Sequence, residues 1–117
     1  MILLTGESIQ IDTDTYASLG IHSSYEDWDG AVRTFGRQNI KILGPSTTEI
    51  VSAPSEGNQR TVKSLSIRNS DNFYISSIAI RIGIFILFGT VLAVGEHLYM
   101  DANSNWTIIT SGLNVRL

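Results

Sequence analysis

The sequence predicts an all-β protein, a single antiparallel β-sandwich or jelly-roll-like domain that covers residues 1–117. Nowhere do apolar residues recur at helical spacing over a dozen residues. Gly, Ser, Asn and Asp interrupt the chain about every eight to twelve residues, which is typical of a sandwich or a barrel. Residues 64–68 alternate between polar and apolar, as a strand with one wet face does. A chain of this length has room for one hydrophobic core, so we expect one domain.

In the first half of the chain, short apolar or alternating runs end at turn-forming residues. Asp29-Gly30 predicts a hairpin turn, because glycine tolerates positive φ. Residues 53–58 contain Pro54 and Gly57 and predict a surface loop. The expected strands of this half are 8–13, 19–25, 31–35, 39–43 and 47–53.

The second half continues the same rhythm and is richer in β-branched residues, which suit a pleated surface. Residues 102–105, Ala-Asn-Ser-Asn, predict a second hairpin loop. The expected strands of this half are 61–69, 74–82, 84–88, 91–94, 98–101, 106–110 and 114–117.

Residues 78–94 are apolar apart from Arg81 and Thr90 and are almost long enough to span a membrane as a helix. Their pattern favours strands instead. Isoleucine or phenylalanine occupies every even position from 78 to 88, whereas small and charged residues share the odd positions with Phe85 and Leu87. A period of two indicates a strand, because a helix would spread these residues around its axis. We therefore expect no membrane contact.

Residues 84–88 are large and apolar on both parities, so both faces of this strand need a cover. The cover is either a loop of the same chain or a second subunit. The chain ends are also apolar, and we expect short arms at 1–6 and 113–117 that dock on a partner. The residues predicted to form the subunit or partner interface are Ile2, Leu3, Leu4, Ile84, Phe85, Leu87, Phe88, Val115 and Leu117.

Composition and motifs argue against several kinds of chemistry. The absence of cysteine excludes disulfides, zinc–thiolate sites and thiol nucleophiles. A net charge of -3, with eight basic residues placed singly along the sequence, argues against nucleic-acid binding. His22 and His97 have no third ligand at metal-binding spacing, and no phosphate loop or nucleophile motif is present. We expect no cofactor, no metal and no enzymatic activity.

Other polar and aromatic residues have an ordinary structural interpretation. The acidic residues 26–29 lack the spacing of a calcium loop and are predicted to form a charged hairpin tip. Asp12 and Asp14 lie two apart and are predicted to share one face at a strand end. Trp28 and Trp106 are expected to be core or sheet-face residues more often than ligand platforms.

Several segments resemble a group of small virion structural proteins of tailed bacteriophages. The likeness covers roughly residues 36–110, and it differs in the 82–88 hairpin, where that group has more Thr and polar residues. The segments that carry it are Gly36-Arg37-Gln38-Asn39, residues 46–51, Ala53-Pro54, residues 59–69, and residues 92–101 with Trp106.

The resemblance implies a β-sandwich or jelly-roll-like module on a phage particle. Together with the all-β pattern and the doubly apolar strand, it leads us to expect a capsid decoration, or cement, protein that binds the lattice of the phage major capsid protein, as a homotrimer on the head surface. Such a protein is assembled in the bacterial cytoplasm, consistent with the lack of cysteine. A tail, neck or fibre-attachment component of the virion is the alternative. A third hypothesis is a glycan-binding module that uses Trp28 and Trp106.

Overall fold

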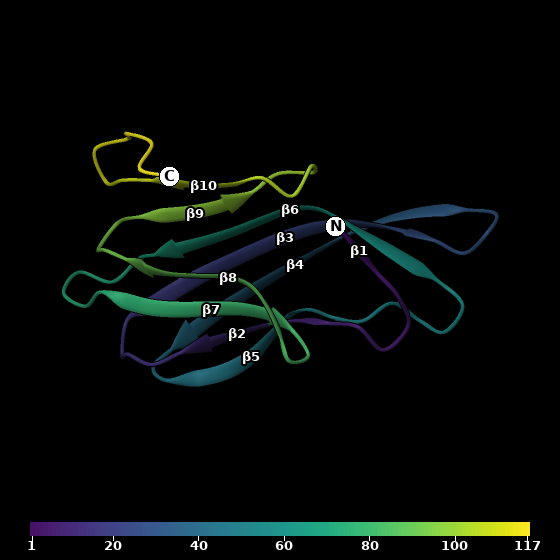
Figure 1. Ribbon diagram of the computed structural model, residues 1–117, viewed down its shortest axis with the longest axis horizontal. Coiled ribbons are helices and arrows are strands. Elements are labelled where there is room, and N and C mark those ends of the chain that lie inside the picture. Colours follow the sequence, from purple (N-terminus) through teal and green to yellow (C-terminus); the bar gives the residue numbers. More distant parts are fainter.

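The computed structural model describes residues 1–117 and contains ten strands and no helix. The strands lie in two antiparallel sheets that pack face to face (Figure 1). The predicted all-β sandwich is therefore confirmed. The strands are β1 (Ile2–Leu3), β2 (Ile9–Thr13), β3 (Ser18–Trp28), β4 (Arg33–Leu43), β5 (Ser46–Val51), β6 (Gln59–Asn69), β7 (Ser76–Ile82), β8 (Phe85–Leu92), β9 (His97–Met100) and β10 (Trp106–Ile109).

The larger sheet, sheet A, has the order β10-β9-β6-β3-β4, and β1 pairs with the early part of β6. The smaller sheet, sheet B, has the order β5-β2-β7-β8. Three connections are hairpins within one sheet: β3–β4, β7–β8 and β9–β10. The other connections cross between the sheets. The β3–β4 hairpin projects beyond the sandwich at the right-hand end of Figure 1.

The core consists of the inward residues of both sheets. Inward positions alternate with polar or exposed ones along β2, β3, β6 and β7, as expected for strands with one buried face. The fully buried side chains include Ile11 and Ile80 from sheet B and Leu19 and Ile67 from sheet A. At roughly 1.5–3 kcal/mol for each buried aliphatic side chain, this cluster holds the two sheets together.

The apolar residues 78–94 form strands, as predicted. Ile78 and Ile80 face the core from β7, and Gly83, at φ +57, turns the chain into β8. A bulge opposite Ile80 and Arg81 shifts the register, so the even-position pattern breaks at the exposed Ile84 and Ile86, whereas Phe88 lies opposite Ile80 on the core face. The structure contains no helix that is long and apolar enough to cross a membrane.

Two predicted interruptions are absent. β4 runs without a break from Arg33 to Leu43, because the equally long β3 pairs with every residue of it. Gly36 lies within this strand, and its lack of a side chain leaves room for the ring of Tyr25, which a Cβ at Gly36 would approach to 2.5 Å. β8 likewise continues through Gly89, opposite Ala79. The predicted hairpin loops at Asp29-Gly30 and at 102–105, and the surface loop at 53–58, are confirmed.

Both chain ends pack on strands of the same chain, where arms docking on a partner were expected. Ile2 and Leu3 form β1 on β6, and the Val62 amide donates to the Met1 carbonyl at 2.8 Å. The last residues fold back on β10, where the Arg116 amide donates to the Ile108 carbonyl at 2.7 Å. The predicted strand at 114–117 is wrong, since only a single bridge joins Val115 to Ile109.

Candidate functional site

The tip of the β7–β8 hairpin carries the most exposed apolar cluster among the predicted interface residues. Ile84 is 89% and Phe85 71% exposed, and the neighbouring Ile86, which was not among the predicted interface residues, is 68% exposed. The tip borders a shallow groove whose other wall is the segment 6–10, just after Leu4. Of the two covers considered from the sequence, a loop of the same chain does not cover this segment: β8 is an edge strand, and its first residues face solvent.

The other predicted interface residues separate into different places. Leu3 has no exposed surface and packs in the core, so it cannot line an interface in this fold. Leu87 and Phe88 are half-buried against the core, and Phe88 stacks on Trp106 with ring centroids 4.9 Å apart. Four predicted residues stay exposed but lie apart from the hairpin tip in the sequence: Ile2, Leu4, Val115 and Leu117.

β8 is also unusual as an edge strand. Exposed edges are normally protected by charged residues, proline or a covering segment. β4 carries Arg33, Arg37 and Lys41, β5 carries Glu49, and β10 is covered by the C-terminal tail. β8, by contrast, has no charged residue and no proline over its eight residues, and the protecting feature it does have is the bulge opposite Ile80 and Arg81. Near the end of the strand, Arg116 Nη2 donates a hydrogen bond to the Val91 carbonyl at 2.9 Å.

The polar residues singled out in the sequence pair with neighbours rather than converge. Asp12 binds Arg81 at 2.8 Å, and this hydrogen bond lowers the pKa of the carboxyl. Asp14 lies past the end of β2 and takes no part in the pair. His97 hydrogen-bonds Ser66 at 2.5 Å, and burial, with a smaller effect of Arg68, lowers its imidazole pKa. No three His, Asp or Glu side chains meet as a metal site would require.

The acidic stretch 26–29 divides between the two faces of sheet A. Glu26 lies on the outer face and binds Arg33 at 2.6 Å, and that hydrogen bond lowers the Glu26 pKa. Asp27 lies on the opposite face and holds Arg60 through two bonds, at 2.8 and 2.9 Å. Arg60 also covers the ring of Tyr25 at 3.8 Å. The Asp27–Arg60 pair fastens the projecting hairpin to β6, whereas the Glu26–Arg33 pair lies within the hairpin.

The two tryptophans do not form one platform. Trp28 lies on the outer face at the end of β3, with the Arg33 guanidinium 5.2 Å from its ring centroid. Trp106 is opposite the buried Met100 and packs against Phe88. Since the rings lie on opposite faces of sheet A, a glycan could not contact both at once.

The outer face of sheet A gathers basic residues that are scattered in the sequence. Alternate residues of β4 place Arg33, Arg37 and Lys41 on this face, and Lys63 and Arg68 join them from β6. Five of the eight basic residues therefore share one face, with Glu26 as its carboxylate. The basic residues are placed singly along the sequence, but the strand pairing brings them together in space. The signal was the four-residue spacing of the cations at 33, 37 and 41, a multiple of the two-residue period, so that a strand places them on one side.

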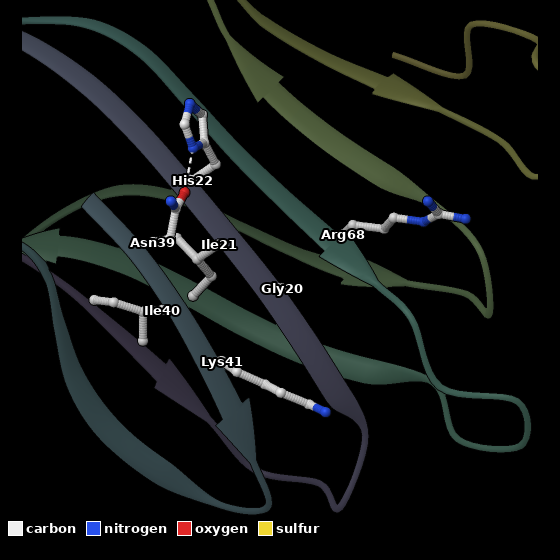
Figure 2. Close-up of a pocket in the computed structure, with 7 residues that line it drawn as sticks. All are labelled: Gly20, Ile21, His22, Asn39, Ile40, Lys41 and Arg68. Atoms are coloured by element: carbon white, nitrogen blue, oxygen red, sulfur yellow. Dashed lines mark hydrogen bonds between the residues drawn. The ribbon is translucent and has the colours of Figure 1, made fainter. Parts of the chain in front are cut away.

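Two shallow hollows lie on this basic face along β3. The first is centred on Gly20 and is shown in Figure 2, with Lys41 extending from β4 and Arg68 from β6. His22 and Asn39 border it and hydrogen-bond each other. The second hollow, by Ser24, is lined by residues that include Phe35, Arg37 and Lys63. No side chain fills the space above Gly20.

Comparison with known proteins gives no relative for this chain: no family model, no curated protein and no solved structure matches it.

Proposed function

We propose that this protein is a structural component that works by burying surface, and that it assembles with copies of itself through β8 and the β7–β8 tip. The observation that carries the proposal is the β8 edge, which has no charged residue and no proline, beside Ile84, Phe85 and Ile86. A free edge pairs readily with a strand of another chain. Each of the three side chains contributes about 1.5–3 kcal/mol when fully buried, which favours assembly.

The biological setting we propose is a bacteriophage head, where the protein acts as a capsid decoration protein. In this setting a homotrimer binds the lattice of the major capsid protein on the outside of the virion. The support is the resemblance of residues 36–110 to small phage virion proteins, together with a surface suited to contacts. A protein that binds only the assembled shell stabilises it at every occupied site by mass action.

The assembly step is tested with Ile86→Lys, which places a charge on the exposed part of the β8 edge. The matched control is Val32→Lys, at another exposed apolar residue far from β8 in the sequence. By light scattering coupled to size exclusion, wild type and Val32→Lys should have about three times the monomer mass, and Ile86→Lys should be a monomer with unchanged circular dichroism. A monomeric wild type would refute the proposal.

The capsid role is tested separately with phage particles that lack the protein. Such particles should release their DNA at a lower temperature than complete ones, and adding the purified protein should restore the difference. Equal thermal stability with and without the protein would contradict clamping. Copy number distinguishes the alternative, since a decoration protein is present in hundreds per virion and a tail, neck or fibre component in far fewer.

A further inference from the structure

The outer face of sheet A is strongly positive within an acidic protein. On this face the paired strands β3, β4 and β6 carry five of the eight cations and one carboxylate, so these three strands place four net positive charges there. The whole protein has a net charge of -3. This surface is in the other sheet from β8, so assembly through β8 does not use the same residues.

Three of these cations have no carboxylate partner. Every ion pair of the protein involves Arg33, Arg60, Lys63, Arg81 or Arg116. Arg37, Lys41 and Arg68 are therefore free to meet an external anion. Lys63 is held only weakly, at 3.6 Å from Glu26, and is about half exposed.

These side chains are arranged in two similar sets along β3. Gly20 pairs with Lys41 on one side and Arg68 on the other, and Ser24 pairs with Arg37 and Ser64, next to Lys63. In each set a small residue of the central strand lies between a cation from β4 and a cation from β6. The flanking backbones are about 9–10 Å apart, and the two sets are about 14 Å apart along the strand.

Two hollows in line, each with cations on both sides, suit a linear polyanion lying along β3. An aromatic ring indicates which one. Phe35 is 75% exposed and lines the second hollow with Arg37 and Lys63. An exposed aromatic ring beside a cationic track is how proteins bind single strands, because bases stack on the ring while phosphates meet the cations. A polyanion without rings or apolar side chains, such as polyglutamate, would gain nothing comparable from the ring.

From this geometry we infer that the outer face of sheet A binds single-stranded nucleic acid, with the phosphates between Lys41 and Arg68 and a base stacked on Phe35. The sequence argument against nucleic acid depended on unclustered basic residues, and the pairing of β4, β3 and β6 supplies the cluster. Contact is sequence-tolerant, because neither phosphates nor stacking identify a base.

The test is fluorescence anisotropy with a labelled oligothymidylate at low ionic strength. Wild type should bind the oligonucleotide. A plot of the logarithm of the association constant against the logarithm of the salt concentration should have a slope of about -2 to -3, as expected for three or four phosphate contacts. The triple variant Arg37→Gln, Lys41→Gln, Arg68→Gln should lose at least about tenfold in affinity, and its affinity should depend less steeply on salt. Phe35→Ala should lose about fivefold to a hundredfold, the effect of one lost stacking contact.

Controls separate this inference from general charge effects. Arg81→Gln removes a cation from sheet B and should leave binding unchanged. Circular dichroism and thermal melts should show that each variant is folded. Failure of wild type to bind, or equal loss in Arg81→Gln and the triple variant, overturns the inference. The inference is also overturned if polyglutamate competes as well as the unlabelled oligonucleotide and if its binding is unchanged by Phe35→Ala. That result would identify an acidic protein as the partner.

Discussion

Replacing Leu3 by alanine tests whether the N-terminus belongs to the core or acts as a docking arm. Leu3 has no exposed surface and contacts the core cluster, whereas its neighbour Ile2 is 57% exposed in the same short strand. The pair is a matched comparison, because each substitution shortens one aliphatic side chain of β1 and leaves the backbone pairing with β6 in place.

The expected cost follows from burial. A fully buried leucine replaced by alanine loses about 2–5 kcal/mol, because transfer energy is lost and a cavity remains. A half-exposed side chain loses about 1 kcal/mol or less. With a typical urea m-value of about 1–3 kcal/mol/M, Leu3→Ala should move the unfolding midpoint down by about 1 M or more, and Ile2→Ala by much less.

The assay is urea unfolding followed by tryptophan fluorescence, at one fixed protomer concentration because assembly adds to apparent stability. The reasoning would be refuted by a Leu3→Ala midpoint that matches wild type. It would also be refuted if Leu3→Ala weakened assembly while leaving the stability of the monomer unchanged, since that is the behaviour of an arm.

Two further predictions concern packing and pH. In thermal or urea melts, Gly36→Ala should lower the free energy of unfolding by about 1–3 kcal/mol, because its Cβ would lie 2.5 Å from the ring of Tyr25. Gly20→Ala, which has open space above it, should leave the free energy of unfolding unchanged or raise it by up to about 1 kcal/mol. The hydrogen bond from Arg116 lowers the Glu96 pKa, so this pair stabilises the fold at neutral pH and the contribution is lost as the pH falls below about 5. Unfolding midpoints measured from pH 7 to pH 3 should therefore fall less steeply in Glu96→Gln than in wild type, and parallel curves would contradict this.

The fold could be predicted because local and global patterns agree along most strands. The alternation at 64–68 and the even-position isoleucines at 78 and 80 identified core faces directly. The patterns failed where long-range pairing decided the outcome. Gly36 looked like a break, but it is the position that admits the Tyr25 ring. The apolar start looked like a free arm, although β6 offers an edge that β1 completes.

The candidate surfaces were predictable to different degrees. Ile84 and Phe85 were recognised because a strand that is apolar on both faces needs a cover on both faces, which a small sheet does not readily supply. They lie at a free edge because of the strand order, and no local sequence pattern predicts that order. The basic face was missed for the same reason. Lys41 and Arg68 are far apart in sequence and become neighbours of Gly20 only through the register of three strands.

Amide hydrogen exchange of β8 tests most directly whether this edge is a subunit contact. In a free monomer, the Phe85–Leu92 amides that do not bond to β7 have no backbone partner and exchange rapidly. We expect slow exchange at these amides in the assembled wild type and rapid exchange in Ile86→Lys. Rapid exchange at the same amides in assembled wild type would contradict pairing through β8.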